Sequence, residues 1–174
     1  MYYSTSHILL TIMSEETKEH PILSKAKITE ILKDVEKTKS VEITKLSVKM
    51  GPAKGENYSG EVMATNFEAT VDGKKKEYHW MVKLPPSDPT RTPMIKAMKM
   101  ETKEFRVYRE LIPAFKKLVK DRKADIELHF APTPYLEFDE ATAADGTKPS
   151  ILAMENLNFM VRALEVYLQI MTRL

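Results

Sequence analysis

The sequence contains no cysteine, which excludes a disulfide framework and any metal site ligated by thiolates. Long apolar runs are also missing. The apolar stretch Ile8–Met13 near the N-terminus is too short to cross a bilayer, and no basic residue precedes it as in a signal peptide. These absences fit a reducing compartment, so we expect a cytoplasmic protein with no membrane partner.

A strong excess of either charge is missing too. The 27 basic and 25 acidic residues give a formal net charge of +2, and this balance gives no reason to expect nucleic acid as a partner. What remains is the composition of an ordinary globular protein. Hydrophobic residues make up 43% of the 174 residues, which suits one domain with one sizeable core.

The first half of the sequence predicts one helix and then three strands. Apolar residues recur at helical spacing in Pro21–Lys37, and an alternation with period two is typical of a strand in Val41–Met50. Glu61–Val71 and Lys76–Leu84 are the next strands. The Asp72-Gly73 pair between them predicts a hairpin turn, because both residue types tolerate positive φ.

The second half begins with a helical pattern in Pro93–Val119, which Pro113 is expected to end or kink. An extended segment is predicted at Ile126–Phe138, a polar loop at Asp139–Pro149, a short strand at Ser150–Met154 and a helix at Asn158–Leu174. This order predicts an α+β fold, with a five-stranded antiparallel sheet and one main helix, around Glu101–Leu111, packed on it. The small lobe of a protein-kinase-like fold has the same layout.

A glycine-bearing segment, Gly51–Gly60, connects the first two predicted strands. A turn of this kind lets backbone N–H groups approach phosphate oxygens without obstruction by a Cβ atom. The spacing G-x3-G-x4-G matches neither the Walker motif nor the protein-kinase glycine loop. Taken by itself, the segment is better explained as an ordinary hairpin loop.

Lys83 ends an otherwise apolar strand that follows this segment, where a lysine can reach ATP phosphates. A lysine in that position needs a carboxylate to hold its ammonium, and Glu104 on the following helix is the candidate, with Glu101 as a rival. The plainer alternatives are a strand-end lysine extending to solvent and a surface charge on a helix. A third feature is the apolar strand that runs into Glu155-Asn156-Leu157. This segment is either a link between two lobes that binds a nucleobase, or a plain buried strand followed by a helix cap.

Four segments together resemble the ecdysteroid kinase-like family, whose members are related to choline kinases and aminoglycoside phosphotransferases. The segments are GENYSGEV, YHWMVKLPP, EFRVYRELIPAF and ILAMENL, and the resemblance runs from about Ile28 to the C-terminus. It implies that the backbone of Gly55, Glu56, Asn57 and Tyr58 lies over ATP phosphates, that Lys83 contacts phosphate and pairs with Glu104, and that Glu155 to Leu157 meet the adenine. Two positions depart from the family pattern. Met100 or Glu101 stands where the family helix has a leading Phe, and Asn156 replaces the hinge Asp.

Kinase chemistry also needs one Asp to orient the acceptor hydroxyl and another to hold Mg²⁺. The resemblance implies an H-x-D catalytic loop, but none of His7, His20, His79 and His129 begins this motif. We therefore expect no catalytic and no metal-binding residue in this chain, with the Mg²⁺ ligands in a missing large lobe. The expected organisation is an unassigned segment at 1–20, a kinase-like small lobe at 21–157 and the start of a truncated large lobe at 158–174.

The function that this predicts is ATP binding by part of a kinase that phosphorylates a hydroxyl of a small-molecule alcohol, inactive by itself. Two alternatives remain open. One is a pseudokinase or regulatory module that binds a nucleotide or a protein without catalysis, and the other is an unrelated α+β interaction domain whose motifs are coincidental.

Overall fold

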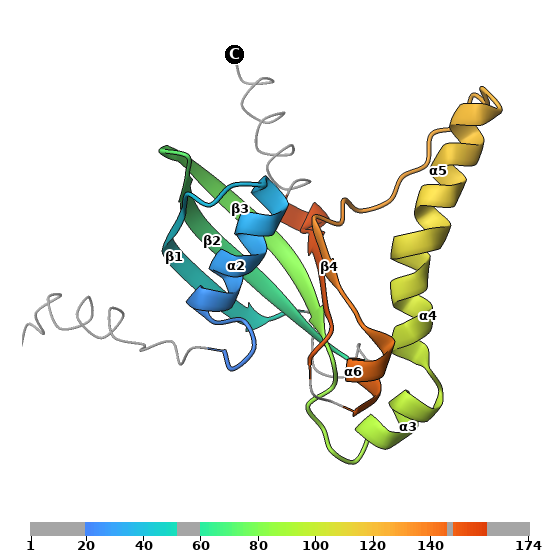
Figure 1. Cartoon of the computed structure of the whole chain (residues 1–174), viewed down its shortest axis with the longest axis horizontal. Helices are drawn as coiled ribbons and strands as arrows, with labels where there is room; N and C mark the ends of the chain where they lie inside the picture. Colours follow the sequence, from blue (N-terminus) through green and yellow to red (C-terminus); the bar gives the residue numbers. More distant parts are fainter. Residues whose placement is uncertain (1–19, 52–59, 146–147, 160–174) are drawn as a thin grey trace, which may run out of the picture.

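The computed structural model describes residues 20–51, 60–145 and 148–159 of the chain. In this part the backbone forms one antiparallel sheet of five strands in the order β1-β2-β3-β5-β4 (Figure 1). Its strands are β1 (Val41–Met50), β2 (Glu61–Val71), β3 (Lys74–Leu84), β4 (Tyr135–Glu137) and β5 (Ile151–Glu155). The predicted α+β fold with a five-stranded antiparallel sheet is confirmed, and it is consistent with a kinase-like small lobe.

The central hairpin turns at the predicted position. Val71 pairs with Lys74, so two residues form the loop, and both have positive φ, 48° at Asp72 and 78° at Gly73. A two-residue loop with both φ values positive matches the right-handed twist of the strands that it joins. At the other end of the hairpin, β1 and β2 are antiparallel neighbours, as the kinase interpretation of Gly51–Gly60 requires.

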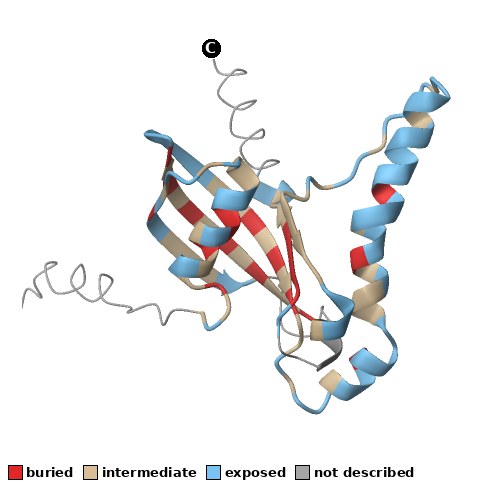
Figure 2. Cartoon of the chain, in the orientation of Figure 1, coloured by how far each residue is buried: buried red, intermediate tan, exposed pale blue. Residues whose placement is uncertain are grey.

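One face of the sheet is covered by helix α2 (Lys25–Glu36), as Figure 1 shows. The helix begins where the Ser24 side chain accepts a hydrogen bond from the backbone of Lys27, and it ends at Lys37, which has a left-handed backbone. Buried residues of β2 and β3 alternate with less buried ones (Figure 2), as expected for a sheet with one covered face. The main core contains the following residues from α2 and the sheet: Ile28, Ile31, Leu32, Ile43, Phe67, Trp80, Val82 and Ile151.

The helix predicted for Pro93–Val119 is divided into shorter pieces. α3 (Thr92–Ala97) and α4 (Met100–Arg106) are separated by Lys99, whose φ is 50°. A π-helical turn, η1 (Val107–Leu111), then leads into α5 (Ile112–Asp121). Pro113 therefore does not end the helix. It lies in the first turn of α5, and the wider π turn before it accommodates a residue that cannot donate a backbone hydrogen bond.

The helix that packs on the sheet face is α2 rather than the one around Glu101–Leu111. The α4–α5 segment lies beside the sheet, and α5 extends away from it (Figure 1). Its contacts with the sheet side of the molecule include the rings of Phe105 and Phe138, which stack with centroids 4.7 Å apart. Periodicity predicted this helix but not which surface it would meet.

Three smaller differences concern the last third of the chain. The extended segment predicted at Ile126–Phe138 forms a strand only in β4, and the predicted polar loop contains the short helix α6 (Glu140–Asp145). The Asp139 carboxylate starts this helix by accepting hydrogen bonds from the backbone N–H groups of Ala141 and Thr142, both at 3.0 Å. Most of the helix predicted at Asn158–Leu174 lies outside the described residues. No helix in the described ranges is long and apolar enough to cross a membrane.

Candidate functional site

Lys83 and Glu104 form the centre of the candidate site. The Lys83 ammonium lies 2.5 Å from the Glu104 carboxylate, and their side chains are only 15% and 28% exposed. Lys83 alternates along β3 with the buried residues Val82 and Leu84, so its side chain belongs to the face opposite α2. The predicted ion pair is confirmed, and it joins the sheet to helix α4.

Glu101, the rival for this role, lies one helical turn before Glu104 on α4, and its carboxylate has no hydrogen-bond partner among the described residues. Burial raises the pKa of the Glu101 carboxyl above its ordinary value of 4.5. Lys96 and Lys83 act in the opposite direction, and the neighbouring Glu104 adds to the rise. The two carboxylates therefore have different roles. Glu104 forms the ion pair with Lys83, whereas the Glu101 carboxylate is half-buried and outside that pair.

Gly60 lies directly against Lys83. A Cβ atom on Gly60 would come within 2.4 Å of the Leu84 carbonyl oxygen and 3.3 Å of the Lys83 Cε atom. Only a glycine lets the start of β2 approach the end of β3 this closely. The end of the β1–β2 connection is thus fixed next to the Lys83 side chain. The sequence showed Gly60 as part of a glycine pattern but gave no sign of this contact.

The residues predicted to lie over phosphates, Gly55, Glu56, Asn57 and Tyr58, fall outside the described residues. The described part of this connection, at Gly51 and Gly60, shows where the segment leaves β1 and where it enters β2. Both Gly51 and Gly60 lie at the same end of the strands as Lys83. Gly51 donates a backbone hydrogen bond of 2.8 Å to Val62, and Val62 pairs with Lys83.

The predicted link between lobes, Glu155 to Leu157, follows β5. Strand β5 pairs with β3 so that Lys83 lies opposite Leu152 and Trp80 opposite Glu155. The link therefore begins three residues along the ladder from Lys83, which is roughly 10 Å in a strand. Two of its backbone N–H groups already have partners, since Glu155 donates to Pro132 and Asn156 donates to His79, each at 2.8 Å. A nucleobase at this link would have to be recognised through other groups.

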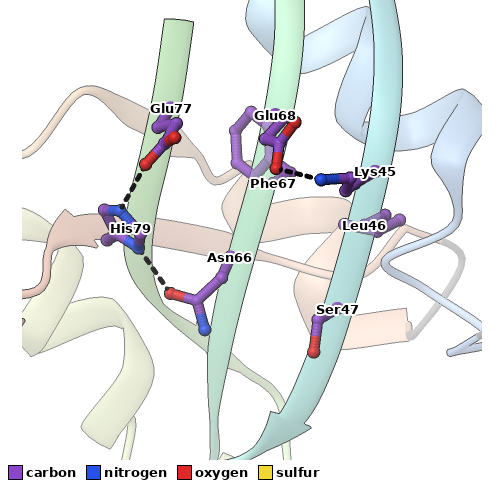
Figure 3. Close-up of a pocket in the computed structure, with 8 residues that line it drawn as sticks. All are labelled: Lys45, Leu46, Ser47, Asn66, Phe67, Glu68, Glu77 and His79. Atoms are coloured by element: carbon purple, nitrogen blue, oxygen red, sulfur yellow. Dashed lines mark hydrogen bonds and ion pairs between the residues drawn. The ribbon is translucent and has the colours of Figure 1, made fainter.

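A groove of about 520 Å³ lies along the middle of β1, β2 and β3 on the sheet face opposite α2 (Figure 3). Its walls carry three polar pairs that Figure 3 shows, one of which joins His79 Nε2 and Glu77 at 3.9 Å. His79 Nδ1 lies 2.9 Å from the Asn66 amide oxygen, and the Lys45 ammonium lies 2.7 Å from the Glu68 carboxylate. The hydrogen bond with Glu68 raises the pKa of Lys45.

His79 also connects this groove to the end of β5. Its ring stacks on Phe159, with centroids 3.5 Å apart. Sequence reasoning did not single out Asn66 or His79, although alternation along the two strands puts both on this face. Their proximity depends on the register, in which Asn66 pairs with His79.

An antiparallel sheet, a lysine near the end of its third strand and a helical carboxylate paired with it define the small lobe of a kinase-like protein. A model of the ecdysteroid kinase-like family matches residues 54–160. This is more than half of the chain, and the chain belongs to that family, which places it among kinase-like phosphotransferases. Comparison with curated proteins and with solved structures gave no match.

Proposed function

We propose that this chain binds ATP on the sheet face opposite α2, with the phosphates at Lys83 and the adenine toward the link after β5. The observation that carries the proposal is the Lys83–Glu104 ion pair of 2.5 Å. A lysine ammonium is a compact charge on a flexible stem, and a carboxylate partner fixes the position from which it can contact phosphate oxygens.

The surroundings of this pair support the proposal. Gly60 brings the end of the β1–β2 connection against the Lys83 stem, and the resemblance to the family implies that Gly55 to Tyr58 in this connection contact the same phosphates. Backbone N–H groups in such a loop are suitable donors to phosphate oxygens. Lys83 and the start of the link after β5 are three residues apart along β3, or roughly 10 Å, so one extended ligand can contact both.

Transfer of the γ-phosphoryl group needs more than this. Kinases of this kind generally use ATP with Mg²⁺, together with an Asp that positions the acceptor hydroxyl. The 174 residues contain no H-x-D motif, and the described ranges hold no group of three or more acidic or histidine side chains that could bind a metal ion. We therefore propose that this chain by itself binds ATP without transferring phosphate, and that the acceptor in the complete reaction is a small-molecule alcohol.

ATP binding to the purified chain, measured by isothermal titration calorimetry, tests the first part of the proposal. Lys83→Ala should weaken ATP binding at least about tenfold, because it removes a charge-assisted contact worth about 1.5–3 kcal/mol. Lys117→Ala is the matched control, since this exposed lysine on α5 lies far from the site and should leave binding unchanged. Equal affinities of the wild-type chain and Lys83→Ala would overturn the assignment of Lys83.

A second assay tests the absence of transfer. The chain is incubated with ATP, Mg²⁺ and steroid, choline-like and aminoglycoside alcohols, and phosphorylated products are measured by mass spectrometry. We expect none. Turnover that disappears in Lys83→Ala would show that the chain carries catalytic residues that we have not identified.

The second candidate is a regulatory module that binds a nucleotide without catalysis. The absence of an H-x-D motif from these 174 residues fits this module as well as it fits part of a kinase. The two candidates differ when any coding sequence that follows residue 174 is added. Turnover by the extended chain supports a kinase, and ATP binding without turnover supports the regulatory module.

A further inference from the structure

A second cavity, of about 420 Å³, is lined by Glu101 at the start of α4 but by neither Lys83 nor Glu104. Its volume is within the range of small-molecule sites, and much of its wall is apolar, as in such sites. The apolar part of the wall consists of Pro21, Ile22, Pro85, Pro86, Ile95 and Pro149. These residues come from the segment before α2, the loop after β3, helix α3 and the segment before β5, so four parts of the chain enclose the cavity.

Most of the polar groups in this wall are already hydrogen-bonded within the protein. The Glu61 carboxylate accepts from the backbone and hydroxyl of Ser87, and the Lys148 ammonium donates to Glu137. The Thr92 hydroxyl lies within hydrogen-bonding distance of the carbonyls of Pro86 and Asp88. The His20 ring accepts from two backbone N–H groups that follow it. None of these groups needs a ligand.

Glu101 is different. It lines the cavity, its side chain is half-buried, and its carboxylate accepts no hydrogen bond from the residues that the structure describes. The charges that face it are those of Lys96, Lys83 and Glu104. Partial burial disfavours the charged form of this carboxylate, so a donor that reached Glu101 from inside the cavity would stabilise that form.

We propose that this cavity binds a small, largely apolar molecule that carries one hydrogen-bond donor, an ammonium or a hydroxyl group, and that the donor is held by Glu101. The apolar walls accept the body of the molecule, and the carboxylate sets its orientation. The site is separate from the proposed nucleotide site, since its wall contains neither Lys83 nor any residue of the link after β5. Glu101 is nevertheless only one helical turn from Glu104.

The test uses the full chain and three probes with the same apolar body. These are 2-phenylethylamine, 2-phenylethanol and ethylbenzene, which carry an ammonium donor, a hydroxyl donor and no donor. Binding is followed by ¹H–¹⁵N NMR titration. We expect saturable shifts at Ser87, Ile95, Lys96 and Ser150 with the first two probes, and binding of ethylbenzene at least about fivefold weaker. No saturable shift at these residues at millimolar concentrations, or equal binding of all three probes, would overturn the proposal.

Substitutions at the same helix separate Glu101 from general effects. Glu101→Gln keeps the shape and removes the charge, and it should weaken the amine about tenfold, the change expected for losing a charge-assisted hydrogen bond, and the alcohol less. Glu110→Gln, on the exposed turn η1 outside the cavity, is the matched control and should change neither affinity. If Glu101→Gln does not fold, Glu101→Asp withdraws the carboxylate by one methylene and should give an intermediate loss.

Measuring amine binding to Lys83→Ala separates the proposed cavity site from the proposed ATP site. The variant should retain amine binding even though its ATP binding is weakened. An unchanged amine affinity in both Glu101 variants would refute the role of Glu101, whatever the result with ATP.

Discussion

The Lys83 ammonium and the Glu104 carboxylate are 2.5 Å apart, although they belong to a strand and to a helix that lies beside the sheet rather than on it. The same distance separates Lys117 and Asp121 on α5, whose side chains are 76% and 55% exposed. Because the two pairs have the same N···O distance but different exposure, comparing them measures what burial contributes to an ion pair.

A double-mutant cycle should give a larger coupling energy for the Lys83 pair than for the Lys117 pair. The variants are Lys83→Met, Glu104→Gln and both together, with Lys117→Met and Asp121→Asn as the comparison. We expect about 1–3 kcal/mol for the first pair and about 0.3–0.5 kcal/mol for the second, as is usual for exposed pairs one turn apart. Urea unfolding measures both, and equal coupling would mean that solvent screens Lys83 as well.

Thr65→Val should stabilise the protein. The Thr65 side chain is fully buried, and its hydroxyl has no hydrogen-bond partner among the described residues. Replacing the hydroxyl by a methyl group of similar size removes an unsatisfied polar atom, so the free energy of unfolding should rise by about 1 kcal/mol. Thr70→Val, on the opposite face of the same strand, is the control and should change stability little. A loss of stability in Thr65→Val would indicate a partner for the hydroxyl outside the described ranges.

Glu137 should make stability depend on acid pH. Its carboxylate lies 3.0 Å from the Lys27 ammonium and 3.1 Å from the Tyr135 hydroxyl, and it also pairs with Lys148. Burial by itself would raise the pKa of Glu137, but these hydrogen bonds outweigh it and the pKa lies below the ordinary 4.5. The unfolded chain therefore takes up the proton first as pH falls. The stabilisation is present above about pH 4.5 and is lost as pH falls through the lower pKa of the folded state.

Glu137→Gln is expected to lose about 1–3 kcal/mol at pH 7 and to flatten the dependence of unfolding free energy on pH in the acid range. Denaturant unfolding at a series of pH values measures both effects. Glu127→Gln is the control, since the Glu127 side chain is 84% exposed and should leave the curve unchanged. An unchanged acid slope in Glu137→Gln would assign the dependence to other carboxylates.

Replacement by alanine should destabilise the protein more at Gly60 than at Gly73. Gly60→Ala places a methyl group 2.4 Å from the Leu84 carbonyl, which forces strands β2 and β3 apart at a cost of about 2 kcal/mol or more. At Gly73 nothing lies within 4 Å, but φ is +78°, so Gly73→Ala should cost only about 1 kcal/mol of backbone strain. Thermal unfolding compares the two. Gly60→Ala should also weaken ATP binding, whereas Gly73→Ala, at the far end of the hairpin, should not.

The strands of the central hairpin could be predicted because period-two alternation and Asp72-Gly73 are local signals. Lys83 and Glu104 could be paired from their order on a strand and the next helix. The resemblance to the family added specificity, which the comparison with the family model then supported. The extended segment that contains β4 was predicted, but the bounds of the strand were not, because three residues are too short for a pattern. Helix α6 was missed because it depends on capping by Asp139.

Features that depend on tertiary contacts were not predictable. Apolar spacing is the same for a helix on a sheet face and a helix beside it, so the sequence could not show that α2 covers the sheet. Asn66 and His79 meet only because of the β2–β3 register. Glu101 lines a cavity whose wall comes from four distant segments, and no window of sequence contains them together.

The left-handed backbone at Lys99 has a consequence for α4. The continuous hydrogen bonding of a helix is interrupted between α3 and α4, so the direction of α4 is not dictated by the turns that precede it. Contacts with the rest of the protein, of which the Lys83–Glu104 pair is one, must then hold the helix in its orientation. Each 1.4 kcal/mol added or removed at these contacts changes the ratio of two orientations about tenfold. A ligand on either side of the helix would therefore be detected as a shift in the population of α4 orientations before any change in the sheet.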